Sequence, residues 1–423
     1  MNATVIFVSL LVLLLIRVPI AVSLGLACVI GMVAGGISFE IIVQQMVTTN
    51  DSFPLLAIPF FILAGEIMSI GGMSRRLVGF AGALVGHMRG GLGAVAVVSS
   101  GFFAALSGSN AATVAAIGGV MNAPMEERGY RPSYTAATIA AAGVPGMIIP
   151  PSILMILYGV VTGVSIGDLF IAGFLPGILI CLSILATNWY LSRYENVEAS
   201  DFAGLRNIYD SFKQAFWPLM MPVIILSGIY GGIFTPTEAA VVAVLYGLIV
   251  GLFYGELSFK TLYKAFLKAV LSSAIVMFVM NNAGVFAWLL TIQQIPQDIS
   301  HYLAVTAGNQ VVYILFVNIL LLLAGCIMNA AAAIVILTSI LYPAAVSFGV
   351  DPVLLGVIMA VNLSIGTVTP PLGVDLFIAS AITKVPLERI VVAIAPYIGV
   401  MIIDLMIISY YPPLSSVLIH IIK

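Results

Sequence analysis

Residues that break helices recur in this chain at an offset of about half its length. Asn110 returns as Asn329, 219 residues later, and Pro150-Pro151 returns as Pro370-Pro371, 220 residues later. Other pairs at these offsets are Pro124 and Pro343, Pro132 and Pro352, and Pro176 and Pro396. In a very apolar chain this repeat predicts a membrane protein of two related halves, whose binding site lies where the breakers coincide.

The composition excludes a soluble fold. Of the 423 residues, 62% are hydrophobic and only 8% are charged, and the mean hydropathy is +1.20. So few charges predict an all-α polytopic protein in a lipid bilayer. The net charge of −2 gives no support for a nucleic-acid partner.

The reactive side chains do not form the pattern of an enzyme. Cys28, Cys181 and Cys326 lie far apart in apolar segments and the three histidines are isolated, so neither a disulfide nor a metal centre is expected. The sequence contains no Ser-His-Asp, Cys-His or phosphate-loop pattern. We therefore expect neither an enzyme nor a prosthetic group.

The positions of the basic residues predict the topology. If the N-terminus is outside and residues 90–125 form a hairpin that enters and leaves on one side, 14 of the 15 Lys and Arg residues lie inside, all except Lys423. This distribution follows the positive-inside rule, and it makes both termini periplasmic. Each half then has five full spans and one re-entrant hairpin, the second at 310–347. Because five is odd, the second half is inverted relative to the first.

The expected organisation is two inverted repeats, 1–193 and 217–423, joined by the polar segment 194–216 as a cytoplasmic linker. Residues 38–48 and 258–268 occupy matching places in the two repeats and are amphipathic at helical spacing. We expect both to be helices lying along the membrane interface.

Two stretches of the first half are candidate binding elements. Ser107–Thr113 (SGSNAAT) is the turn of the first hairpin, where unpaired backbone groups and side-chain oxygens suit a weakly held alkali cation. Gly143–Ser152 contains three prolines and two glycines, so the span 133–162 is expected to be two half-helices joined by an unwound segment. The simpler alternatives are hydroxyl groups that only hold neighbouring helices together, and a proline kink.

The second half repeats both elements. Gly325–Asn329 lies at the turn of the second hairpin, and Ser364–Pro371 breaks the span 352–383. We expect the two tips and the two broken helices to meet near the membrane midplane. They would form two related cation sites with a substrate between the tips, facing the N-termini of half-helices.

The predicted core regions lack basic residues. No Lys or Arg lies between Arg131 and Arg193, or between Lys268 and Lys384. We therefore expect no buried cation for an anionic substrate, whose charge would be offset by helix dipoles and by co-bound cations.

Acidic residues within the apolar runs are few, and such residues are functional candidates. Glu66 is expected to pair with Arg75 or Arg76. Asp375 follows the second broken segment by four residues and is a candidate near the site.

At these motifs the chain resembles the large membrane subunit of tripartite ATP-independent periplasmic (TRAP) transporters, over essentially its whole length. The resemblance rests on Ser107–Thr113, Gly143–Ser152, 231–240 (GGIFTPTEAA), Gly325–Asn329 and Gly366–Gly373. It implies a permease of the bacterial inner membrane that takes up an organic acid together with Na+, which is co-transported. It also implies a periplasmic substrate-binding protein and a small four-span membrane subunit as partners.

The resemblance further implies an elevator mechanism, in which a transport domain moves against a fixed scaffold. The expected scaffold spans are 1–52, 167–193, 217–268 and 388–411. The expected transport parts are 53–163, with the hairpin 90–125, and 269–383, with the hairpin 310–347.

The motifs and the resemblance together assign candidate site residues. Sodium site 1 would comprise Ser107, Ser109, Asn110, Thr113, Gly143 and Pro145. Sodium site 2 would comprise Gly325, Asn329, Ser364, Gly366, Thr367 and Thr369. The substrate would contact Ser107, Ser109, Ser152, Asn329 and Asp375. Many similar members carry an acid where Asn329 stands, so the amide here removes a charge.

Several substrates and modes of transport agree with these features. The closest likeness is to members that carry sialic acid. A C4-dicarboxylate or another carboxylate is the alternative for a TRAP permease, and a stand-alone sodium/dicarboxylate carrier would share the inverted architecture. A passive channel is disfavoured, because polarity is confined to the breaks and tips and does not run along whole helix faces.

Overall fold

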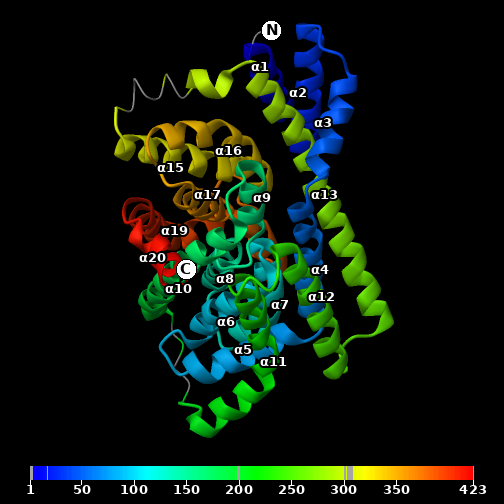
Figure 1. Cartoon of the computed structure of the whole chain (residues 1–423). Helices are drawn as coiled ribbons and strands as arrows, with labels where there is room; N and C mark the ends of the chain where they lie inside the picture. Colours follow the sequence, from blue (N-terminus) through cyan, green and yellow to red (C-terminus); the bar gives the residue numbers. More distant parts are fainter. Residues whose placement is uncertain are drawn as a thin grey trace.

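The computed structural model describes residues 3–16, 18–195, 197, 201–299, 302 and 308–422, and within these ranges the chain consists of helices and connecting turns (Figure 1). Eight helices of the described part are long and apolar enough to cross a membrane. The predicted all-α polytopic membrane fold is therefore confirmed. Arg17 and Lys423, which belong to the predicted charge distribution, lie outside the described residues.

The first half carries the helices up to the polar connection between the halves. They are α1 (Ala3–Leu15), α2 (Ile20–Gly35), α3 (Glu40–Asn50), η1 (Phe53–Leu56), α4 (Ala57–Ile70), α5 (Met73–Val85), α6 (Gly91–Ser107), α7 (Asn110–Glu127), α8 (Pro132–Gly143), η2 (Val144–Met147), α9 (Ile153–Thr162), α10 (Ile166–Leu191) and η3 (Ser192–Tyr194).

The second half follows the same order with longer helices at its start. They are α11 (Gly204–Tyr230), α12 (Pro236–Phe253), α13 (Phe259–Ile292), α15 (Gln310–Ile327), α16 (Ala330–Ser347), α17 (Pro352–Gly366), α18 (Val374–Thr383), α19 (Leu387–Tyr410) and α20 (Pro413–Ile422).

Each half contains a helical hairpin followed by a broken helix, as the sequence predicts. The hairpin α6–α7 turns at Gly108, whose φ of 61° lies in the left-handed region that favours glycine. The hairpin α15–α16 turns at Met328 and Asn329. The first broken helix is interrupted over 148–152, between η2 and α9, and the second over 367–373, between α17 and α18.

The two hairpins approach the centre from opposite ends of the molecule. In Figure 1 α6 and α7 lie in the lower part and α15 and α16 in the upper part, with α8, α9 and α17 between them. Both arms of the second hairpin are long enough to span by themselves. Their connecting turn nevertheless packs against the second broken helix, because a Cβ on Gly325 would lie 3.0 Å from the Cα of Gly366. This arrangement agrees with an inverted repeat of hairpins and broken helices.

One predicted element of the second half is wrong. Residues 258–268 do not form a separate interfacial helix, because α13 continues without interruption through 34 residues. Its start is fixed by a capping box of Ser258 and Thr261, and neither proline nor glycine follows before Gly284. In the first half Pro54 and the non-helical Asp51 and Ser52 do separate α3 from α4.

The predicted linker 194–216 is partly helical. Helix α11 begins at Gly204, so the second part of this segment is the start of a long helix and only the part before Gly204 connects the halves. The polar residues of 204–216 extend a helix whose apolar part begins near Trp217. Helices α5 and α20 were not predicted as separate elements.

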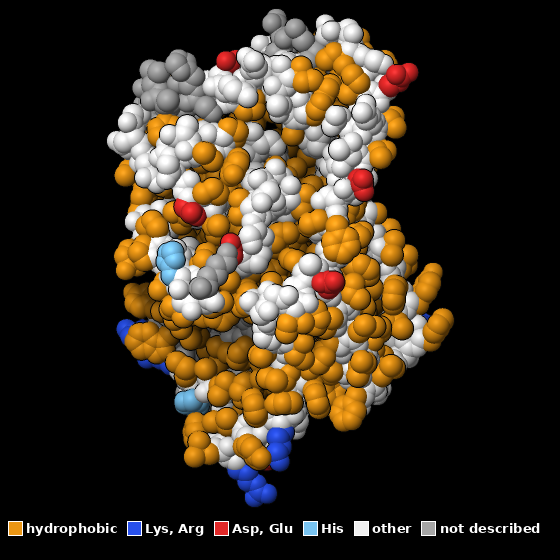
Figure 2. Space-filling view, viewed as in Figure 1, with side chains coloured by type: hydrophobic (Ala, Val, Ile, Leu, Met, Phe, Trp, Pro, Cys, Tyr) orange, Lys and Arg blue, Asp and Glu red, His pale blue; other side chains and the backbone are white. Residues whose placement is uncertain are grey.

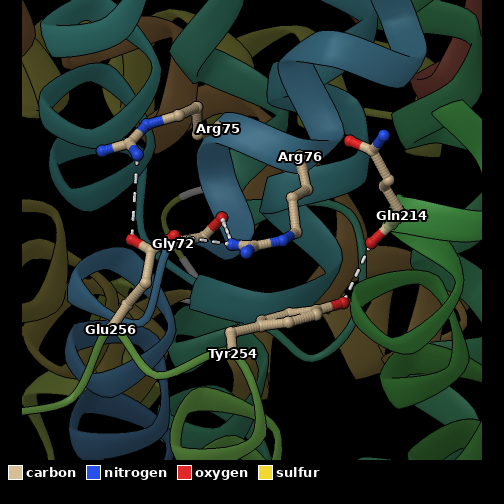
Figure 3. Close-up of polar contacts among 6 residues, drawn as sticks. All are labelled: Gly72, Arg75, Arg76, Gln214, Tyr254 and Glu256. Atoms are coloured by element: carbon tan, nitrogen blue, oxygen red, sulfur yellow. Dashed lines mark hydrogen bonds and ion pairs between the residues drawn. The ribbon is translucent and has the colours of Figure 1, made fainter.

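A cluster of side chains joins the turn between α4 and α5 to α11 and to the segment after α12 (Figure 3). Arg76 Nη1 lies 3.0 Å from Glu256 Oε1 and donates to the Gly72 carbonyl at 2.9 Å, and its guanidinium lies 3.6 Å from the centroid of the Tyr254 ring. The Tyr254 hydroxyl in turn donates to the Gln214 carbonyl at 2.9 Å. Arg75 also faces Glu256, at 3.8 Å.

Glu66 does not belong to this cluster, so its predicted pairing with Arg75 or Arg76 is wrong. Its carboxylate Oε1 lies 2.8 Å from Lys268 Nζ on α13. The reason is the turn at Gly71 and Gly72, which directs α5 away from α4 and brings both arginines to Glu256.

The packing divides most helices into two groups, which touch where α4 contacts α6 and where α13 contacts α16. Helix α4 packs against α12 and α13, and α13 packs also against α2 and α3. By contrast, α10 packs against α6, α19 and α17, and α19 packs against α8 and α17. The first group forms the column on the right of Figure 1, beside the body that holds the hairpins and broken helices.

Candidate functional site

A cavity of about 440 Å³ lies between these two groups of helices. One wall is made by α4 and α13, which contribute Glu66 and Lys268. The other is made by the two hairpin tips and the two broken helices, whose residues include Ser109, Asn329 and Asp375. Elements far apart in the sequence therefore meet at one partly open cavity, where a few polar and charged side chains lie among apolar ones.

The first hairpin tip is held by its own hydroxyl groups. Ser109 caps the N-terminus of α7, because its hydroxyl accepts from the Ala112 amide. The Ser107 and Thr113 hydroxyl oxygens are 2.9 Å apart, and the Thr113 hydroxyl lies 2.8 Å from the Ser109 carbonyl. The first broken helix packs against this turn, since a Cβ on Gly146 would lie 2.7 Å from the Ser109 carbonyl oxygen.

The residues assigned to sodium site 1 are therefore close together, although not all of them are available as ligands. The Pro145 carbonyl accepts from the Ile148 and Ile149 amides, which form the turn that ends the half-helix. Gly143 lies against α7, because its Cβ would meet the Val114 side chain and lie 3.4 Å from the Asn110 carbonyl oxygen. A side chain at Gly143 would push the broken helix away from the tip.

Asn110 points away from the other site 1 residues and into the second half. Its amide nitrogen donates to the Thr367 hydroxyl at 2.9 Å and to the Ser364 carbonyl at 3.3 Å. The Thr367 hydroxyl oxygen lies 2.6 Å from Asp375 Oδ2 and 2.6 Å from the Ser364 carbonyl oxygen. We call Asn110, Ser364, Thr367 and Asp375 the bridging cluster.

The bridging cluster contains more acceptors than protons. The single Thr367 proton serves either the carboxylate or the Ser364 carbonyl, and not both at once. Three buried oxygen atoms have no hydrogen-bond partner: Asn110 Oδ1, Ser364 Oγ and Asp375 Oδ1. Each unsatisfied buried group costs about 1–3 kcal/mol. The cluster thus has the composition of a site for a hard cation, with oxygen ligands and one negative charge.

The residues assigned to sodium site 2 come together in part: Asn329 and Thr367 line the same cavity, and Gly325 packs against Gly366. Asn329 is exposed to the cavity and caps α16, with its side-chain oxygen accepting from the Ala331 amide at 2.9 Å. Ser364 and Thr367 are hydrogen-bonded to Asn110 of the first half. The Thr369 hydroxyl donates to the Ile365 carbonyl at 2.7 Å, within its own helix end.

Of the residues assigned to the substrate, all but Ser152 line the cavity. Ser152 is fully buried, donates to the Met147 carbonyl and accepts from the Met155 amide at the start of α9. It therefore stabilises the break in the helix.

Lys268 and Glu66 are cavity residues that the sequence reasoning did not assign to the site. The expectation that the core offers no cation to a substrate concerned a buried cation, and the Lys268 side chain is 61% exposed; the continuous helix α13 nevertheless carries this lysine to the cavity wall. The available signal was the lack of any helix breaker between 258 and 283, which argues for one helix and against an interfacial segment ending at Lys268.

The sequence model of the family described as "Tripartite ATP-independent periplasmic transporter, DctM component" matches residues 7–414. The chain belongs to this family. It is accordingly a TRAP permease, a multi-pass membrane protein and not an enzyme, which confirms the resemblance seen in the motifs.

Relatives of this TRAP permease are similar over most of its length. The isethionate TRAP transporter permease protein DctMQ of Oleidesulfovibrio alaskensis is 43% identical over 94% of this chain, which spans only 63% of that longer relative. The C4-dicarboxylate TRAP transporter large permease protein DctM of Pseudomonas aeruginosa is 41% identical, with 88% of both chains covered. The 2,3-diketo-L-gulonate TRAP transporter large permease protein YiaN of Escherichia coli is 37% identical over 89% of this chain and 88% of that one.

A solved structure shares the fold of the TRAP permease. The YdaH transporter of Alcanivorax borkumensis, whose crystal structure is described as revealing an unusual topology, superposes with a TM-score of 0.66 over 88% of both chains. The identity is 17%, so this likeness concerns the fold alone.

Proposed function

We propose that this TRAP permease takes up an organic acid together with Na+, which binds at the bridging cluster. The observation that carries the proposal is that three residues of the bridging cluster, Asn110, Ser364 and Asp375, each have a buried side-chain oxygen without a hydrogen-bond partner. A cation there would be coordinated by oxygens and neutralised by Asp375. The C-terminal end of α17 adds carbonyl groups with partial negative charge at the same point.

The bridging cluster provides a reason for coupling between ion and substrate. Asp375 and Thr367 also line the cavity where we place the organic acid. An anion near an unneutralised Asp375 is repelled, whereas an anion near a bound cation is attracted. Sodium at the cluster would therefore raise the affinity of the cavity for the acid, and the acid would raise the affinity for sodium by the same factor.

Sialic acid and the C4-dicarboxylates are the two substrate candidates that we carry forward. The motif resemblance favours sialic acid. The names of the relatives refer to C4-dicarboxylates, isethionate and 2,3-diketo-L-gulonate, which are also organic acids. All of them are organic anions small enough for a cavity of about 440 Å³.

The partners we propose are a periplasmic substrate-binding protein and a small four-span membrane subunit, as the word tripartite in the family description suggests.

On the face shown in Figure 2, Lys and Arg side chains lie in the lower half, and the N-terminus lies at the upper end in Figure 1. By the positive-inside rule the lower end would be cytoplasmic, in the inner membrane, and the N-terminus periplasmic.

We also propose an elevator movement, with a division of helices that differs from the one expected from sequence. The scaffold would include α4 and α13, because they pack against α2, α3 and α12. The moving body would include α10 and α19, because they pack against the hairpin and the broken helices. The substrate in the cavity would then cross the membrane as the moving body slides against the scaffold.

The test is uptake into proteoliposomes that contain the permease and its small subunit, with the binding protein added outside. We expect labelled acid to accumulate only with an inward sodium gradient and the binding protein present. Equal uptake in potassium without any gradient would contradict sodium coupling. Sodium-driven uptake without the binding protein would favour a stand-alone carrier instead.

A further inference from the structure

Among the described residues that line the central cavity, Lys268 is the only Lys or Arg. It belongs to a stripe on α13 that faces the cavity, since Ser272 and Val276, one and two turns further on, line it as well. The facing stripe of α4 consists of Ile62, Gly65 and Glu66. Lys268 and Glu66 are thus paired on the cavity wall, on helices that we place in the scaffold.

The pair leaves the lysine accessible and holds the glutamate in place. The Lys268 side chain is 61% exposed, whereas Glu66 is 12% exposed, and their charged atoms are 2.8 Å apart. An ammonium group has three donors, and Glu66 Oε1 accepts only one of them. The remaining directions are open to a second acceptor in the cavity.

The pair lies next to the first hairpin tip. A Cβ on Gly65, the neighbour of Glu66, would be 3.3 Å from the Cα of Ser107. An acid bound at the tip would therefore lie close to the helix turn that carries Glu66 and its partner Lys268.

The acidic residues of the cavity would repel an anionic substrate unless a positive charge lies nearby. Glu66 and Asp375 are its acids, and only Lys268 among the described lining residues is basic. Sodium at the bridging cluster would neutralise Asp375, and Lys268 would neutralise Glu66, which leaves no net repulsion against an arriving anion.

We propose that Lys268 binds the carboxylate or sulfonate group of the transported acid, and that Glu66 is a positioning residue that orients the ammonium. The proposal rests on the proposed uptake of an organic acid. It adds a scaffold contact to a site whose other residues come from the hairpins and the second broken helix. Because the contact comes from the fixed side, it would exist on one side of the membrane and break as the moving body leaves.

The alternative is a structural ion pair that only holds α4 against α13. The two explanations predict different transport activities for a variant in which the two charges are exchanged. Glu66→Lys with Lys268→Glu restores an ion pair between the helices, but moves the cation to the less exposed position and places a carboxylate toward the substrate.

The experiment compares initial uptake rates in proteoliposomes with the complete complex, using sialic acid, succinate and isethionate as probes. The variants are Lys268→Gln, Lys268→Arg, Glu66→Gln and the charge swap, with Lys264→Gln as a matched control one turn earlier on α13 and outside the cavity lining. Thermal unfolding in detergent checks that each variant is folded.

We expect Lys268→Gln to raise the KM for the transported acid by about tenfold or more, because a charge-assisted hydrogen bond is lost, with the half-saturating sodium concentration within about twofold of wild type. Lys268→Arg and Lys264→Gln should stay close to wild type, and the charge swap should be at least as impaired as Lys268→Gln. Glu66→Gln should change KM less than Lys268→Gln.

Two results would overturn the proposal: a wild-type KM in Lys268→Gln, or recovery of transport in the charge swap, which would show a structural pair. Both results differ from a failure of the proposed function. In that case the wild-type complex itself would show no sodium-driven uptake of any probe.

Discussion

The Asn110 side chain donates a hydrogen bond of 2.9 Å to the hydroxyl of Thr367, although 257 residues separate the two in sequence. This bond joins the N-terminus of a hairpin arm in one repeat to the broken helix of the other. It makes one shared cluster out of residues that the repeat symmetry would divide between two separate ion sites. The two halves are therefore coupled directly at the point where we place sodium.

The first prediction concerns the Thr367 hydroxyl. Thr367→Val keeps the shape of the side chain and removes the oxygen at the centre of the bridging cluster. We expect the half-saturating sodium concentration of uptake to rise by about tenfold, because loss of one buried hydrogen-bonding group costs about 1–2 kcal/mol. Thr383→Val is the matched control, since the Thr383 hydroxyl only donates to Ala379 within α18. A normal sodium titration in Thr367→Val would contradict the assignment.

The second prediction concerns the contact between the second tip and its broken helix. A Cβ on Gly366 would lie 2.6 Å from the Cα of Gly325, so Gly366→Ala must push the two backbones apart. We expect a loss of about 1–3 kcal/mol of stability, seen as a lower unfolding temperature in detergent, together with weaker sodium dependence. Gly399→Ala, where a Cβ meets nothing within 4 Å, should match wild type. Equal unfolding temperatures for both variants would argue against this close approach.

The third prediction tests which helices move. A Cβ on Gly65 of α4 would lie 3.6 Å from the Cβ of Ser107 at the first tip, within the range of about 3.5–4.5 Å that disulfides require. In a protein without Cys28, Cys181 and Cys326, we expect oxidation of Gly65→Cys with Ser107→Cys to stop the uptake that this double variant shows when reduced, and renewed reduction to restore that level. Unchanged uptake by the cross-linked protein would show that α4 moves with the first hairpin, as the sequence-based division has it.

Much of the fold followed from the sequence because prolines and glycines act locally. Pro150-Pro151 and Pro370-Pro371 cannot lie within a continuous helix, and the structure has a break at each. Gly108 and Asn329 likewise lie at the turns of hairpins. Such positions can be located without knowing what packs against them.

The site was harder to predict, because side-chain direction depends on packing across the repeats. Repeat symmetry suggested that Asn329 and Thr367 share a site; both line the central cavity, but the Thr367 hydroxyl is hydrogen-bonded to Asn110 of the other half. Lys268 was assigned to the interface by its amphipathic surroundings, whereas helix continuity carries it to the cavity. Neither relationship is present in local spacing, so only three-dimensional packing reveals it.

The central claim is that a cation binds at the bridging cluster, and Asp375 supplies its only carboxylate. The most direct test is the unfolding temperature of the purified complex in sodium chloride and in potassium chloride at equal ionic strength, for wild type and Asp375→Asn. A ligand that binds only the folded state stabilises it by about 2.7 kcal/mol at a hundred times its Kd. We predict that sodium raises the unfolding temperature of wild type and leaves that of Asp375→Asn unchanged. An equal sodium-specific rise in both proteins, or no rise in wild type, would contradict the account.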